Sequence, residues 1–114
     1  MAFEAQFVHD GDYIDHTPGT AVAAGTVVVQ GDLVGVAKGD MEANRLGALA
    51  VTGVFDFAKE AGGGVTFAVG AIAYWDDGNN VAVATDGAGA NKQIGKVVKA
   101  AADADATVRV RLSQ

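Results

Sequence analysis

One alternating stretch constrains the fold more than any other part of the chain. Between residues 46 and 57, bulky side chains fall at every second position, at Leu49, Val51, Phe55 and Phe57, with Gly53 in the gap. Because successive side chains of a β-strand point to opposite faces, this period predicts a long strand with one bulky face. We expect this strand to form the floor of a core, with a bend or bulge at Gly53.

The rest of the sequence predicts further short strands separated by glycine-rich turns. They are expected at residues 26–30 and 33–37, as a hairpin around Gly31-Asp32, at 71–75 and 80–85, as a hairpin around the turn at 76–79, at 93–98 and at 107–112. Residues 100–105 are expected to be a loop, and Gly62 to Gly64 the strongest break. We predict an all-β fold of about eight short strands, as a small barrel, β-clip-like or jelly-roll-like domain.

The chain is expected to be divided into an arm and a single domain. Residues 1–20 mix the rings of Phe3, Phe7 and Tyr13 with acidic residues and end at a Pro-Gly turn, which favours an extended N-terminal arm. Residues 21–114 are expected to form one all-β domain, which suits a chain of 114 residues. Half of the residues are hydrophobic but most of these are Ala or Val, so the core should be thin and oligomeric burial is favoured.

The two halves of the chain resemble each other, which predicts a duplicated β unit. Three pairs of segments match at separations of 45, 47 and 48 residues: 25–27 with 70–72, 34–37 with 81–84, and 46–47 with 94–95. Each half then ends in an alternating strand, around Phe55 and around Val110. The alternative is a chance match, because Ala- and Val-rich segments resemble one another easily.

Charge and composition argue against several partners and compartments. The net charge is −6, and an acidic domain repels the phosphates of nucleic acids. There is no cysteine for a disulfide or a thiolate site. The first ten residues do not resemble a signal peptide, and no apolar run reaches the length of a membrane span.

Motifs that could carry chemistry are few, and we predict no enzyme, no cofactor and no metal. The cluster of His9, Asp10, Asp12, Asp15 and His16 has metal-ligand residue types, but a solvated acidic segment is the expected alternative. The segment Gly87 to Lys92 resembles a phosphate loop but lacks the spacing of a Walker motif. Ser113 is the one serine, and the remaining acid pairs lie in predicted turns.

The predicted functional residues are therefore those of an interface. The candidates are Phe3, Phe7, Tyr13, Trp75, Arg109 and Arg111. Trp75 is either a core residue or an interface anchor, whereas Tyr74 is expected in the core. Arg109 and Arg111 are expected on the outward face of the last strand. There they are either solvated or paired with acids of a neighbouring subunit, for example those of its N-terminal arm.

The order of several motifs resembles small capsid cement proteins of tailed phages. The resemblance covers residues 10 to 112 and is carried by segments 13–15, 17–19, 24–28, 33–37, 46–55, 74–76 and 108–112. Some relatives in this family are labelled as recombinases. This chain lacks the Walker loop and the basic face which that label would require.

The resemblance implies an all-β structural virion protein without catalytic residues. The resemblance implies a protein that is made in the host cytoplasm and binds to the outside of the assembled head. Its implied partners are the phage major capsid protein and further copies of itself. A trimer is favoured over a dimer by analogy with decoration proteins of the lambda type. The alternative is a small β-sheet module that binds carbohydrate or a host surface. No nucleic acid, membrane or cofactor is implied.

Overall fold

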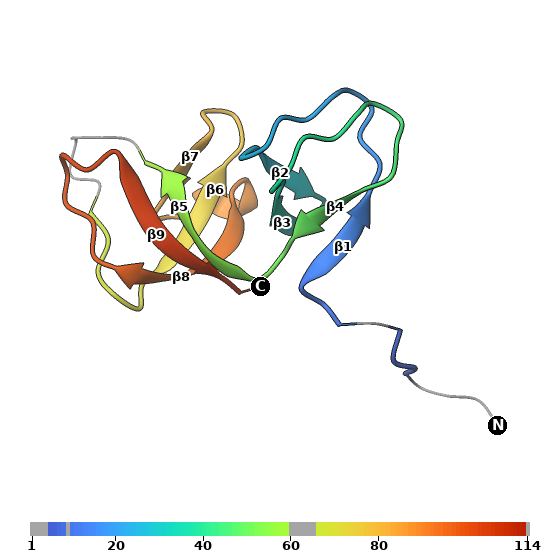
Figure 1. Cartoon of the computed structure of the whole chain (residues 1–114). Coiled ribbons are helices and arrows are strands. Elements are labelled where there is room, and N and C mark those ends of the chain that lie inside the picture. Colours follow the sequence, from blue (N-terminus) through green and yellow to red (C-terminus); the bar gives the residue numbers. More distant parts are fainter. Residues whose placement is uncertain (1–4, 9, 60–65, 114) are drawn as a thin grey trace.

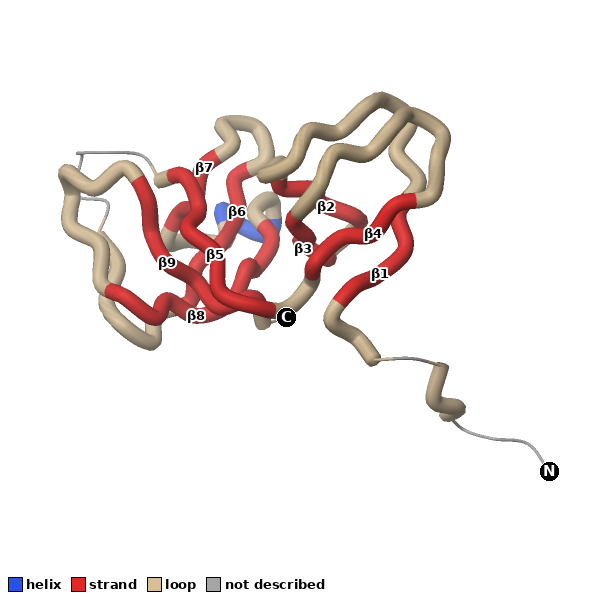
Figure 2. Tube along the Cα trace, viewed as in Figure 1, coloured by secondary structure: helices blue, strands red, loops and turns tan. Residues whose placement is uncertain are grey.

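The computed structural model describes residues 5–8, 10–59 and 66–113, which form two antiparallel β-sheets (Figures 1 and 2). The first sheet has the order β1-β4-β3-β2 and consists of β1 (Tyr13–His16), β2 (Val27–Gln30), β3 (Leu33–Val36) and β4 (Gly47–Ala50). The second has the order β5-β9-β8-β6-β7 and consists of β5 (Gly53–Ala58), β6 (Ile72–Asp76), β7 (Val81–Val83), β8 (Lys92–Lys99) and β9 (Thr107–Leu112). A short 3₁₀ turn, η1 (Gly87–Gly89), precedes β8. The predicted all-β fold is confirmed.

The second sheet curls until its two edge strands approach each other. One parallel bridge joins Lys59, which follows β5, to Ala82 on β7. The sheet is not closed into a barrel. Of the predicted architectures, a closed barrel is therefore wrong, because the edges β5 and β7 meet at one bridge and do not form a continuous ladder.

The long alternating stretch is two strands and not one. Residues 47–50 form β4 in the first sheet, whereas residues 53–58 form β5 in the second. The chain bends where expected, at Gly53, whose φ is +109°. Leu49 and Phe57 consequently lie in two different hydrophobic clusters. An alternating period continues through such a bend, so it cannot show that the chain changes sheet.

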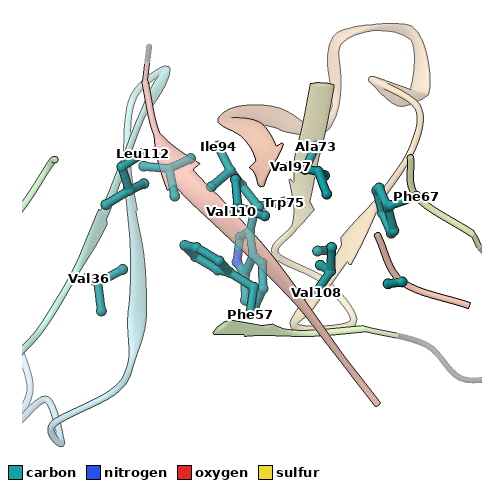
Figure 3. Close-up of a cluster of buried hydrophobic side chains, with 13 residues drawn as sticks. Val36, Phe57, Phe67, Ala73, Trp75, Ile94, Val97, Val108, Val110 and Leu112 are labelled. Atoms are coloured by element: carbon teal, nitrogen blue, oxygen red, sulfur yellow. The ribbon is translucent and has the colours of Figure 1, made fainter. Parts of the chain in front are cut away.

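The main core lies between the two sheets and inside the curl of the second one. Phe57, Trp75 and Val110 lie near its centre, and Val34 and Val36 contribute from β3 of the first sheet (Figure 3). The rings of Phe57 and Trp75 pack edge to face with centroids 6.0 Å apart. A smaller cluster of Ala37, Met41 and Leu49 lies on the other face of the first sheet.

The two sheets contain the same four-stranded unit, which confirms the predicted duplication. The pairing of Val27 with Val36 in the first sheet corresponds to the pairing of Ile72 with Lys96 in the second. Strands β1, β2, β3 and β4 thus correspond to β5, β6, β8 and β9, and they occur in the same spatial order. Strand β7 is the addition in the second unit.

Backbone hydrogen bonds repeat at the entrance of both units. Gly25 N donates to Ala37 O at 2.6 Å, and Gly70 N donates to Val97 O at 2.7 Å. Both glycines have φ of +88°, a conformation that residues with a Cβ rarely adopt. The match of Gly25 with Gly70 was therefore predicted correctly.

The other two predicted matches are wrong. Segment 34–37 corresponds to 94–97 and not to 81–84, and segment 46–47 does not correspond to 94–95. The second unit contains β7 and η1 between its second and third strands, and this insertion raises the separation from 45 to 60 residues. The predicted strand around Phe55 also opens the second unit and does not close the first.

The structure contains the remaining predicted strands and hairpins close to their expected bounds. Both hairpins, the strand at 93–98 and the final strand are confirmed, with Val108, Val110 and Leu112 buried on one face of β9. Residues 13–16 of the predicted arm form β1 and pair with β4. The division into an arm (1–20) and one domain (21–114) stays a prediction, and Gly62 to Gly64 lie outside the described residues.

Replacing Gly95 by alanine is expected to destabilise the fold strongly. A Cβ at Gly95 would overlap the carbonyl oxygen of Arg111 and lie 2.7 Å from Ser113 N, both on the neighbouring backbone. We expect Gly95→Ala to lower the free energy of unfolding by about 3 kcal/mol in urea denaturation. Gly39→Ala is the control, because a Cβ there meets no atom within 4 Å. Equal midpoints for the two variants would contradict this packing.

Candidate interaction surface

Half of the basic side chains of this acidic protein lie on the outer face of the second sheet. Four of the eight Lys and Arg residues, Lys96, Lys99, Arg109 and Arg111, are exposed on β8 and β9. Among the described strand residues of that face, the acids that accompany them are Asp56 on β5 and Asp76 on β6. The inward side chains of β9 belong to the core, so the alternation of the strand fixes the direction of both arginines.

Arg109 is neutralised within its own chain. It lies opposite Asp56 in the β5–β9 ladder, and its Nε and Nη2 donate to the two carboxylate oxygens at 2.9 and 3.2 Å. Hydrogen bonding from Arg109 lowers the pKa of Asp56 below its usual value of 3.8, and the pKa of Arg109 is raised in turn. Arg109 is therefore already paired within its own chain.

Arg111 and Lys96 face each other without such a partner. Strand register places four exposed side chains in one row across the sheet: Val54, Arg111, Lys96 and Ile72. Among the described residues neither cation of this basic row has an ion-pair partner. Like charges directly opposite in a sheet repel each other, so the row carries an uncompensated positive potential between two apolar side chains.

The predicted absence of a basic face is thus wrong at this place. The sequence has a net charge of −6, but folding brings Lys96 next to Arg111 from positions 15 residues apart. Net charge cannot show such a local concentration. The sequence signal for this local concentration of charge is the alternation of buried and exposed positions in the two strands. Both cations fall at exposed positions of that alternation.

The predicted interface residues of the N-terminal segment are exposed where the structure describes them. Phe7 is 79 % exposed, beside Val8 at 82 %, and Tyr13 is 44 % exposed. Tyr13 accepts a hydrogen bond from Lys38 Nζ at 2.8 Å, and the ammonium lies 5.4 Å from its ring centroid. Phe3 lies outside the described residues. The structure does not bring Phe7 or Tyr13 together with Arg109 or Trp75 in one contiguous contact.

Trp75 is a core residue, which settles the alternative left open by the sequence. It is 4 % exposed, and its indole nitrogen donates to Asp77 Oδ1 at 3.2 Å. Tyr74, which was expected in the core, is half-buried. An aromatic pair for stacking on a sugar ring is therefore absent from this part of the described surface.

A groove opens between the two sheets. It has a volume of about 420 Å³ and is lined by Val27, Val36, Phe55, Phe57 and Trp75, with Asp56 and Asn80 at its polar side. Thr26 brings the one hydroxyl of the lining, and these residues include no histidine to activate it and no pair of facing carboxylates. The groove is thus a gap in a thin core, and its residue types give no basis for assigning a reaction.

The segment Gly87 to Lys92 is built as a structural turn. Asp86 accepts a hydrogen bond from Ala88 N, and Lys92 Nζ donates to Gly89 O at 3.1 Å. Lys92 also forms an ion pair of 2.8 Å with Asp32 on the β2–β3 turn, and this hydrogen bond lowers the pKa of Asp32. The loop that resembled a phosphate site thus connects the two sheets.

The acidic N-terminal cluster does not converge on a common centre. Asp12 accepts from Thr52 Oγ1 at 3.0 Å, and His16 Nδ1 lies 3.3 Å from Gln30 Oε1. His9 lies outside the described residues. Over the described ranges, no three His, Asp or Glu side chains are grouped to hold a metal ion. No helix in those ranges is long and apolar enough to cross a membrane.

Replacing Asp56 by asparagine should remove a stabilising contribution that depends on pH. Because its pKa is lowered in the folded state, the carboxylate stabilises the fold at neutral pH, and this effect is lost as the pH falls below about 4. We expect Asp56→Asn to lower the unfolding free energy by under about 1 kcal/mol at pH 7, since the pair is exposed. The difference from wild type should shrink progressively as the pH is lowered from about 5 towards 2 in urea denaturation. Asp103→Asn is the control, and a difference independent of pH would refute the pairing.

Comparison with known proteins assigns the chain to one family. The model of a family described as phage cement protein matches residues 8–112. The match includes both sheets and the basic row. No curated protein and no solved structure matches the chain.

Proposed function

The chain belongs to the phage cement protein family, which indicates a structural role in the capsid, and we propose that it binds the outer surface of the phage head. There it holds neighbouring major capsid subunits together and stabilises the shell. The observation that carries this proposal is the family match over residues 8–112. On this proposal the protein is made in the host cytoplasm and functions on the virion.

A non-catalytic mechanism suits the side chains that are present. A protein that contacts two capsid subunits at once adds binding free energy across their boundary, which raises the barrier to separation. This effect needs a stable fold and repeated weak attachment, and it needs no reacting group. The antiparallel sheets with a common apolar layer provide such a rigid body.

We further propose that the protein self-associates, with a trimer favoured over a dimer. Exposed apolar side chains support this proposal: Phe7, Val8, Leu46, Val54 and Val69 are each more than half exposed in the single chain. Closed cyclic assemblies are the common form of such contacts. The preference for three copies rests on the analogy with lambda-type decoration proteins alone.

The alternative of a carbohydrate- or host-surface-binding module has little support. Such a module would need aromatic rings gathered on an exposed face, and Trp75 is buried while Tyr74 is half-buried. The solvent-exposed ring of Phe7 lies on the N-terminal segment and carries no polar atom for a sugar hydroxyl.

Mixing the purified protein with undecorated heads tests the proposal. We expect it to sediment with the heads at a fixed number of copies per particle, and to raise the temperature at which the heads release DNA. Heads that are already fully decorated serve as the control and should bind no more. If the protein remains in the supernatant with undecorated heads, the cement function is refuted.

Removing residues 2–8 is expected to weaken head binding or self-association without unfolding the protein. The deletion removes Phe7 and Val8 but keeps Asp12, whose carbonyl accepts a hydrogen bond from Val51 N at 3.0 Å. The thermal midpoint should change little, because neither side chain belongs to a core cluster. Unchanged binding and unchanged mass would contradict a role for this segment.

A further inference from the structure

The basic row lies on a face that its own chain leaves uncovered. Val54 and Ile72 are 54 % and 40 % exposed, and Val98, at the bulge of β8 beside this row, is 42 % exposed. Three exposed apolar side chains thus lie beside two cations that repel each other, and a contact that brings acidic and apolar groups would relieve both. Exposed apolar side chains gathered with unbalanced charge are typical of a contact surface.

The N-terminal segment of the same sequence has the complementary residue types. Four acids, Glu4, Asp10, Asp12 and Asp15, lie within the first sixteen residues, where the sequence has no Lys or Arg. Phe7 and Val8 are among the most exposed apolar side chains of the described residues. Acidic and apolar groups therefore lie close together over a short length of chain, as the two cations and the apolar side chains do on the basic row.

The dimensions of the two surfaces are compatible. The row spans four adjacent strands, which is about 14 Å at a strand spacing near 4.8 Å. Residues 11 and 12 form a turn at the base of β1, and the stretch from Phe7 to Asp10 before it covers about 10 Å when extended, at roughly 3.3 Å per residue. One segment can therefore place an apolar and an acidic side chain over the row at the same time.

A second copy supplies the segment more readily than the same chain does. The described residues before β1, 5–8 and 10–12, extend away from both sheets, on the side opposite to β8 and β9 (Figure 1). β1 is held in place by four residue pairs with β4 and by the bond from Val51 N to Asp12 O. The point at which the segment leaves the first sheet is therefore fixed, and its described residues extend away from the basic row of their own chain.

We infer that the N-terminal segment of one copy lies on the basic row of the next copy, with its acids against Lys96 and Arg111. This contact rests on the proposed self-association and names the surfaces that make it. It joins two different surfaces, so it is a head-to-tail contact, which closes into a ring when the rotation between copies allows. Phe7 or Val8 then covers the exposed side chains of Val54 or Ile72.

Charge reversal tests the contact on the full-length protein by light scattering after size exclusion. We expect Lys96→Glu to weaken self-association roughly tenfold or more, and Asp12→Lys to do the same. The double variant Lys96→Glu/Asp12→Lys should recover the wild-type mass, because each interface again joins opposite charges. Arg45→Glu is the matched control, since this exposed cation pairs with Glu42 away from the row. Thr52→Val controls for the bond from Thr52 to Asp12 that the second variant also breaks.

The outcomes separate this contact from the proposed function. A wild-type protein that is monomeric in solution and on heads overturns the self-association, and the contact with it. A wild-type oligomer that keeps its mass in Lys96→Glu overturns the contact alone. If the wild type is an oligomer and Lys96→Glu keeps its mass but loses head binding, the row faces the capsid. This outcome also overturns the contact between copies. Recovery in the double variant and in no single variant supports it.

Discussion

The packing of β3 against the inside of the second sheet is the contact on which the rest of the structure depends. Each sheet is small, and a few antiparallel strands without a second layer are marginally stable in water. Val34 and Val36 close the open side of the curled sheet, where Phe57, Trp75 and Ile94 are buried. Without this layer the aromatic rings would face solvent, and the two units would be joined by little more than the short connection at residues 51–52 and the ion pair of Lys92 with Asp32.

Local patterns predicted the strands well but not how they assemble. The hairpin around Gly31-Asp32 has a two-residue turn and β-branched strands, so its signal is contained in consecutive residues. The split between β4 and β5 is invisible to the same reasoning, because side-chain alternation persists while the chain crosses from one sheet to the other. The duplication was detectable, but its alignment failed where the second unit carries β7 and η1, since a constant offset cannot accommodate an insertion.

The interaction surface was predictable only in part, for a related reason. The outward direction of Arg109 and Arg111 followed from the period of the last strand. Their different surroundings did not, since they depend on which residues of β5 and β8 lie opposite in the ladder: Asp56 for the first, and Val54 with Lys96 for the second. Trp75 shows the same limit, because its place beside Tyr74 at a strand end left both faces possible until the curl of the sheet decided it.

The difference between the two units also shows where this fold accepts foreign sequence. The second unit connects its second and third strands through β7 and η1, whereas the first does so through two residues, and the shared four strands pair alike in both. The tip at Gly31 and Asp32 is therefore an insertion point that the architecture has already accommodated once. A peptide grafted there would be presented to solvent beside β8, at the cost of the ion pair between Asp32 and Lys92, which makes this turn the natural position for displaying a foreign epitope.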